Sequence, residues 1–104
     1  MDTANLKARL KTEIIQRRGR FDFTAGITPD MGANLVSFTV DGEELIYWDP
    51  AGFLAGTSQT GAFNMFPTPC RLANSAYDFE GRHIHQTKNG EPVFIHGLIR
   101  DESF

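Results

Sequence analysis

The three histidines of the chain, His83, His85 and His96, have the clearest capacity for chemistry. One residue separates His83 from His85, so on a β-strand their side chains would point to the same face. Predicted turns would bring Asp78 and His96 to that face, and three imidazoles with a carboxylate could bind zinc or a non-haem metal. The favoured interpretation is an exposed hairpin in which His83 pairs with Asp78, because Glu91 lies too far beyond His85 for an H-x-H metal motif.

A second group of reactive residues lies upstream of the histidines. Arg71 follows Pro67 and Pro69 in the segment FPTPCR. Its guanidinium offers a fork of donors that suits neighbouring hydroxyl oxygens, and the His96 imidazole can donate or accept a hydrogen bond. The structural alternatives are an Arg71 that fixes its own loop through backbone carbonyls and a His96 at the core edge beside a turn glycine. Cys70 is not predicted to act as a nucleophile, because only Arg71 lies near enough in the sequence to activate its thiol, and it is expected to be a small, mostly buried side chain.

Two tight turns are predicted to position the histidines. The pairs Glu80-Gly81 and Asn89-Gly90 suit two-residue turns, so a three-stranded meander is expected from Ala76 to Ile99. Pro92 lacks an N–H and weakens the pairing of the last strand. Two-residue turns would place the following residues opposite each other: Asp78 and His83, Lys88 and Glu91, Ile84 and Ile95, His83 and His96.

The first half of the chain also shows the alternation of β-strands. Leu6, Leu10 and Ile14 recur at helical spacing, but a strand near Ile14 is favoured over a helix. A second strand is predicted where Phe21, Phe23 and Ala25 alternate with polar residues and should form one buried face. Residues 26–32 should break that strand. The sequence therefore predicts an antiparallel, strand-rich N-terminal half.

A third hairpin is predicted further along. Val36, Phe38 and Val40 alternate, Asp41-Gly42 suits a type I′ turn, and Leu45–Trp48 should return. Residues 49–64 are rich in Gly, Ala, Thr and Ser and are expected to form a long loop.

Composition limits the class of protein. A chain of 104 residues with ten Gly and five Pro is at most one domain and is expected to be rich in β-structure and turns. Net charge is −3, and no stacking aromatics accompany the N-terminal basic residues, so a solvated segment is preferred over contact with nucleic acid or a membrane. One cysteine excludes an internal disulfide, and the lack of a signal peptide or an 18-residue apolar run favours a cytoplasmic protein. The basic residues are Lys7, Arg9, Lys11, Arg17, Arg18 and Arg20.

Three segments in order resemble the aldose 1-epimerase (mutarotase) family. They are MGANLVSFTVDGEELIYW from Met31, FPTPCRLANSAYDFEGRHI from Phe66 and VFIHGL from Val93. The resemblance implies an all-β fold, the N-terminal portion of a galactose mutarotase-like β-sandwich (supersandwich) with antiparallel hairpins and a meander. Residues 1–19 would be a lead segment that includes a first strand, and residues 20–104 a partial sandwich domain.

The family interconverts the α and β anomers of an aldose without a cofactor or metal. Arg71 and His96 match the family's substrate-binding arginine and histidine, whereas Cys70 replaces an asparagine that commonly precedes this arginine. The general acid and general base of the family fall beyond Phe104. An N-terminal fragment, inactive alone, is therefore expected, with an aldohexose or its phosphate as ligand and self-association through exposed strand edges.

Two alternatives remain open at the level of sequence. One is a non-catalytic sugar-binding β module that uses Arg71, His96 and an aromatic such as Trp48 or Phe66. The other is a small metal-binding β-protein that uses His83, His85 and His96.

Overall fold

The structure, a computed structural model, describes residue 4 and residues 8–55 and 60–104. Within these ranges the chain forms antiparallel β-sheets with the short helix α2 and a 3₁₀ turn, which confirms the predicted all-β class. The strands are β1 (Glu13–Arg17), β2 (Phe23–Thr28), β3 (Asn34–Val40), β4 (Glu43–Glu44), β5 (Ala76–Phe79), β6 (Arg82–His85), β7 (Thr87–Lys88) and β8 (Glu91–Pro92); the helix is α2 (Pro50–Ala55) and the 3₁₀ turn is Ala73–Ser75.

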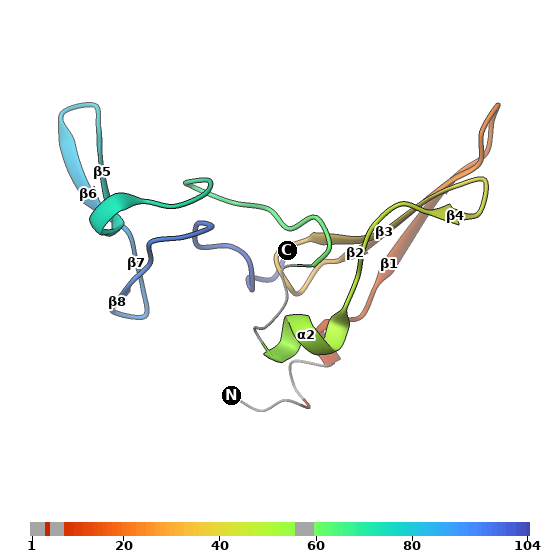
Figure 1. Cartoon of the computed structure of the whole chain (residues 1–104), viewed down its shortest axis with the longest axis horizontal. Helices are drawn as coiled ribbons and strands as arrows, with labels where there is room; N and C mark the ends of the chain where they lie inside the picture. The colour runs from red at the N-terminus through yellow and green to blue at the C-terminus, as the bar shows by residue number, and fades with distance from the viewer. Residues whose placement is uncertain (1–3, 5–7, 56–59) are drawn as a thin grey trace.

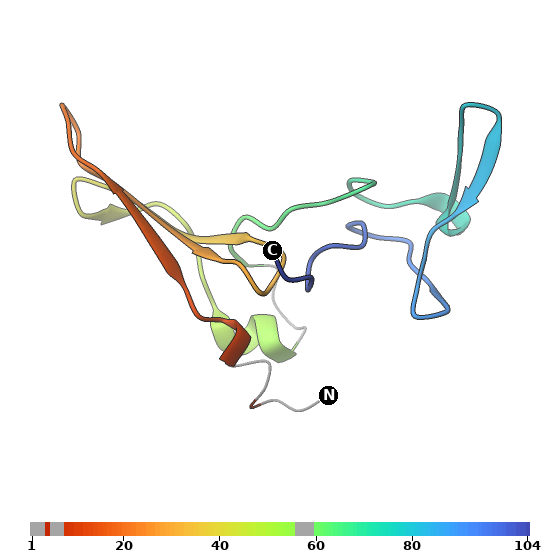
Figure 2. The same cartoon turned by 180° about the vertical axis from the view of Figure 1, so that it is seen from behind.

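The molecule has two halves. Strands β1 to β4 form one sheet in sequence order, and β5–β6 and β7–β8 form two separate two-stranded sheets. Figure 1 shows the larger sheet on one side, the two hairpins on the other, and two extended segments between them. The view from behind shows the same open arrangement, with the C-terminus near the middle (Figure 2).

The larger sheet contains the strand predicted near Ile14. This strand is β1, and its Ile15 lies opposite Ala25 of β2. β2 continues through Gly26 to Thr28, so the prediction that the strand breaks at Gly26 is wrong. An added Cβ at Gly26 would lie 3.1 Å from Thr12 Cγ2 and 3.2 Å from Ser37 Cβ, so glycine allows crowded neighbours within the strand.

The hairpin between β3 and β4 confirms the predicted turn and shortens the predicted strand. Asp41 and Gly42 have φ of 49° and 84°, as a type I′ turn requires. The returning strand is Glu43–Glu44 and not Leu45–Trp48. Glu44 Oε1 accepts the Phe38 N–H at 2.9 Å, so a side chain takes a donor that the ladder would otherwise use.

The predicted loop from Asp49 to Asn64 contains helix α2. Asp49 begins it: its side chain accepts the Gly52 N–H at 3.0 Å and its carbonyl accepts the Phe53 N–H at 2.9 Å. Pro50 occupies the first helical position, where a missing N–H costs little. The Asp-Pro pair was therefore a helix-start signal that the composition argument overlooked. Residues 56–59 of the predicted loop lie outside the described residues.

The core of the described chain is small. The buried apolar side chains are Met31 between β2 and β3, Val36 in β3 and Phe53 in α2. Phe23 and Ala25 are only half-buried, so the buried face predicted for their strand forms only in part. The reason is physical: no second layer of described residues covers this part of the sheet.

The two C-terminal hairpins form as predicted but do not join into a meander. Asp78 lies opposite His83, and Lys88 lies opposite Glu91, which confirms both turn registers. The Val93 N–H donates to the Gln86 carbonyl at 2.8 Å. Beyond that bond the chain turns away, so the predicted three-stranded meander is wrong, as are the pairs Ile84 with Ile95 and His83 with His96.

The reason for the separation lies in what the departing chain meets. Pro92 has no N–H for the ladder, and Ile95 forms a bridge with Arg71, 24 positions earlier in the sequence. The C-terminal residues then return to the larger sheet, where the Gly32 N–H donates to the Glu102 carbonyl at 2.6 Å. The Phe104 N–H likewise donates to the Pro29 carbonyl at 2.9 Å, so the C-terminal segment ties the two halves together.

Candidate functional site

Two segments distant in sequence run antiparallel between the two halves of the molecule. We call residues 66–72 and 94–98 the strap pair. Three backbone hydrogen bonds join them: Leu98 N–H to Phe66 O at 2.7 Å, His96 N–H to Cys70 O at 2.9 Å, and Leu72 N–H to Phe94 O at 2.7 Å. The strap pair therefore brings the arginine after the prolines and the histidine of the His-Gly pair onto neighbouring segments.

Gly97 permits the close approach of the two segments. Its φ is +70°, and an added Cβ would lie 2.5 Å from the Phe66 carbonyl oxygen and 2.6 Å from the Phe66 nitrogen. No side chain fits there without moving backbone. Cys70 and His96 also have positive φ, 54° and 62°, so the strap pair departs from a regular ladder at two hydrogen-bonded residues.

Arg71 is exposed and lies opposite Ile95. Within the part of the chain that the structure describes, its guanidinium has no hydrogen bond or ion pair. The structural alternative for Arg71, a loop fixed by bonds from the guanidinium to backbone carbonyls, is thus not what the structure contains. All five N–H donors are available to a ligand.

His96 is half-buried with its ring against Phe63. The ring centroids are 5.1 Å apart in an edge-to-face arrangement. Nδ1 of His96 is buried and has no hydrogen-bond partner among the described residues. A buried ring nitrogen without a partner carries a desolvation cost, which a hydroxyl group of a ligand would relieve.

An aromatic cluster continues from Phe63 towards helix α2. The Arg100 guanidinium lies 5.0 Å from the Phe63 ring centroid and 5.2 Å from that of Phe53. Trp48 contacts Phe53 at 5.4 Å between centroids, whereas the Phe66 side chain is 63% exposed. Sequence reasoning did not find Phe63 or the stacked Arg100, because residues so far apart carry no common spacing signal.

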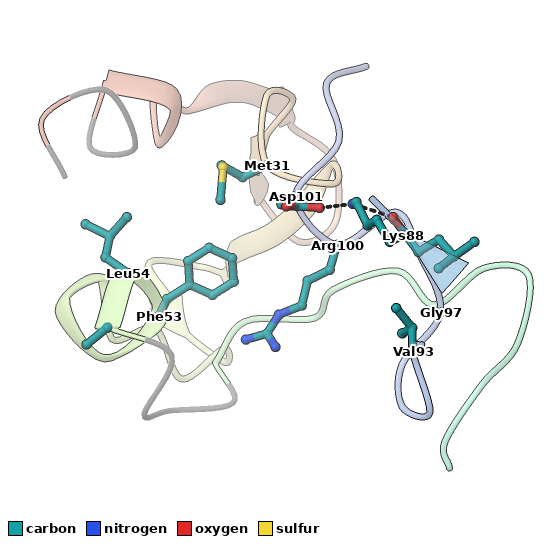
Figure 3. Close-up of a pocket in the computed structure, with 10 residues that line it drawn as sticks. Met31, Phe53, Leu54, Lys88, Val93, Gly97, Arg100 and Asp101 are labelled. Atoms are coloured by element: carbon teal, nitrogen blue, oxygen red, sulfur yellow. Dashed lines mark hydrogen bonds and ion pairs between the residues drawn. The ribbon is translucent and has the colours of Figure 1, made fainter. Parts of the chain in front are cut away.

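A pocket of about 390 Å³ opens beside this cluster (Figure 3). This size falls in the range of ligand pockets, about 300 to 1,000 Å³. Gly97 lines the pocket, but Arg71 and His96 do not, so the pocket adjoins the strap pair without containing its two predicted binding residues. The strap pair carries the polar groups suited to a sugar, whereas the pocket wall is mainly apolar, with Met31 and Phe53 on one side.

Lys88 closes the polar side of the pocket. Its Nζ donates to the Leu98 carbonyl at 2.7 Å, pairs with Asp101, and lies 2.8 Å from Glu102 Oε1. Burial disfavours the charged ammonium, but the hydrogen bonds to Asp101 and Glu102 outweigh it, so the pKa of Lys88 is raised. Because both acidic groups neutralise Lys88 and hold it in place, this ammonium serves as a structural tie.

The histidines do not assemble as a metal site. His83 Nδ1 lies 2.7 Å from Asp78 Oδ1, and the rings of His83 and His85 are 4.7 Å apart, as the predicted hairpin face requires. His96 instead lies on the strap pair. Among the described residues no group of three His, Cys, Asp or Glu side chains could hold a metal ion. The metal-binding alternative therefore lacks its third ligand.

Two further sequence predictions concern Cys70 and the basic N-terminal residues. Cys70 is exposed, so the prediction that it is mostly buried is wrong; it lies on the short two-segment strap pair. Arg17, in β1, is exposed as predicted, but Arg9 is half-buried and donates to the carbonyls of Asp30 and Asp101. Lys7 lies outside the described residues.

Comparison with known proteins gives the family. A family profile described as Aldose 1-epimerase matches residues 22–104, which is more than half of the chain. The chain therefore belongs to the aldose 1-epimerase family, and its antiparallel hairpins agree with the galactose mutarotase-like β-fold expected from the resemblance. No curated protein and no solved structure gives a significant match. No helix in the described part of the chain is long and apolar enough to cross a membrane.

Proposed function

We propose that this chain supplies the sugar-binding part of an aldose 1-epimerase, with Arg71 and His96 as the substrate-binding residues. The observation that carries the proposal is the strap pair. It places on adjacent segments an exposed guanidinium and a buried imidazole nitrogen without a partner. The proposed ligand is an aldohexose or its phosphate, and membership of the aldose 1-epimerase family supports a sugar as the ligand.

The chemistry divides between binding and proton transfer. Anomer exchange requires a base to remove the proton of the anomeric hydroxyl while an acid protonates the ring oxygen, so that the ring opens and recloses on either face. Arg71 can donate two parallel hydrogen bonds to neighbouring hydroxyl oxygens, and His96 Nδ1 can accept from or donate to a third. The proposed acid and base come from outside residues 1–104.

The test is a titration of the ¹⁵N-labelled protein with α-glucose, α-galactose or glucose 6-phosphate, in which NMR records the amide shifts of the protein. Exchange between the sugar anomers is followed by NMR in the same samples. Saturable shifts at residues 70–72 and 94–98 are expected in the wild type. Arg71→Ala and His96→Ala should abolish them. The matched controls, Arg82→Ala and His85→Ala, remove the same residue types from β6 and should leave them unchanged.

The outcomes separate the candidate functions. Binding with no acceleration of anomer exchange supports a sugar-binding segment that needs an acid and a base from elsewhere. Acceleration lost in both site variants would show that residues 1–104 themselves supply the acid and the base, and would contradict the proposal that both come from elsewhere. Absence of any shift at the strap pair with all three sugars would contradict the proposal.

The division into residues 1–19 and 20–104 and the cytoplasmic location stay predictions.

A further inference from the structure

The described chain exposes more surface than a globular protein of its size. Its accessible area is 7383 Å², whereas a compact monomer of this mass exposes about 5,800 Å². Its radius of gyration is 16.2 Å, compared with about 13 Å for a compact domain of this length. The excess of roughly 1,500 Å² is larger than the roughly 800 Å² that each partner contributes to a stable interface.

Part of this surface is the free edge of the larger sheet. β1 pairs with β2 on one side and has no neighbour among the described strands on the other. All five of its residues are exposed, and Ile14 and Ile15 are each 59% exposed. An open edge with two isoleucines at its centre and no proline or bulge can pair with a further strand.

The apolar face beside this edge is hollowed. Ile15 lies opposite Ala25, which lies opposite Phe38, so these three residues share one face. A groove of about 410 Å³ runs over that face, and its wall includes Arg17 and Phe23. Phe23 and Phe38 stack at 5.9 Å between centroids. The edge and the groove form one continuous surface that ends at β1.

We infer that a second copy of this chain pairs with this edge, β1 against β1, antiparallel about a two-fold axis at Ile15. In that register Ile15 meets Ile15 of the other copy, and Glu13 of each copy lies opposite Arg17 of the other. Opposite charges directly across a strand pair are favourable, and both pairs would lie on the same face as Ile15 and flank it. The two four-stranded sheets would become one eight-stranded sheet, with the two grooves side by side.

Neighbouring registers are less favourable. A two-fold axis at Ile14 would place Arg17 opposite Lys11 of the other copy, which sets two cations against each other, and Glu13 opposite Ile15. An axis at Gln16 would place Arg17 opposite Ile15 and leave Glu13 without an opposite charge. The order of residues in EIIQR is thus self-complementary in one symmetric register, as an isologous interface requires.

The test measures the mass of the chain by sedimentation equilibrium over a range of concentrations. The wild type should reach twice the chain mass of 11.6 kDa. Arg17→Glu would set Glu13 against a second carboxylate, and Glu13→Arg would set Arg17 against a second guanidinium. Each variant should weaken the dimer by about tenfold or more. A mixture of the two variants restores both opposite-charge pairs and should form a mixed dimer with wild-type affinity.

The control is Leu45→Lys. Leu45 is 58% exposed, as the edge residues are, but it follows β4 at the opposite edge of the sheet. The dimer affinity of this variant should therefore equal that of the wild type. Far-UV circular dichroism of each variant checks that the sheet remains. A monomer at all concentrations would overturn the inference. So would a dimer that Arg17→Glu leaves intact, or two weakened variants whose mixture does not recover. These outcomes are independent of sugar binding at the strap pair.

Discussion

The β5–β6 hairpin and the strap pair are two antiparallel pairings of similar length with different physical bases. The hairpin joins residues close in sequence through the Glu80-Gly81 turn, and an added Cβ at Gly81 would meet nothing within 4 Å. The strap pair joins residues 22 to 32 positions apart, and its Gly97 lies against the Phe66 backbone. The first is determined locally, whereas the second forms only when distant segments meet.

This difference bears on function. The hairpin carries His83 and His85, the residues with the most regular spacing, and they are exposed. The strap pair carries Arg71 and His96, which have no periodic relation in the sequence, and it holds the buried nitrogen without a partner. The proposed binding groups thus lie where the backbone is most constrained by long-range contacts.

The largest expected effect is a loss of stability when the glycine of the strap pair is replaced, compared with the glycine of the hairpin turn. Gly97→Ala should destabilise the chain by about 2–4 kcal/mol, because a positive φ and a clash with the Phe66 backbone add together. Gly81→Ala, with a similar φ and open space, should cost about 1 kcal/mol. Urea unfolding at one protein concentration measures both. Equal losses would show that the strap pair is not closely packed.

A smaller effect is expected at the tie between β7 and the C-terminal segment. Lys88→Met should cost about 1 kcal/mol, since charge-assisted hydrogen bonds are lost from a partly exposed site. Because the folded pKa of Lys88 is raised, its contribution is complete below the unfolded pKa of about 10.4 and declines as pH rises through the folded value. Stability of wild type and variant should therefore converge in strong alkali.

The control for Lys88 is Lys11→Met, at an exposed position. This substitution should leave the free energy of unfolding equal to that of the wild type, within experimental error, at every pH. The ordinary pKa of lysine is about 10.4, so a scan from about pH 8 to about pH 12 crosses it. If the loss of unfolding free energy in Lys88→Met stays constant over that range, packing and not the ammonium accounts for the loss.

The smallest effect is expected within the hairpin. Asp78 and His83 form an ion pair when His83 is protonated, but their side chains are 80% and 59% exposed. Asp78→Asn should therefore change the free energy of unfolding by less than about 0.5 kcal/mol at pH 6. Glu91→Gln, exposed on β8, is the matched control. A loss above about 1 kcal/mol at Asp78 alone would show that the exposed hairpin is more tightly coupled than its solvent exposure implies.

Local chemistry explains which parts of the fold were predictable. Asp41-Gly42, Glu80-Gly81 and Asn89-Gly90 all adopt positive φ at both residues, because glycine and the short turn determine the geometry before any packing. The helix after Asp49 has a recognisable N-cap residue in its sequence. It was not predicted because the Gly, Ala, Thr and Ser content of residues 49–64 favoured a loop. The end of β4 was not readable, because it depends on a Glu44 carboxylate that reaches back to Phe38.

By itself the sequence determined the three two-residue turns and the registers of the β5–β6 and β7–β8 hairpins, and its segments indicated the family to which the chain belongs. Only the tertiary structure decided that Ile95 leaves β7 and meets Arg71, that His96 packs on Phe63, and that Arg100 lies over two phenylalanines. Turns and alternation follow from the dihedral preferences of a few consecutive residues. Long-range pairing depends instead on which segments meet once the chain has folded, and sequence spacing does not encode that meeting.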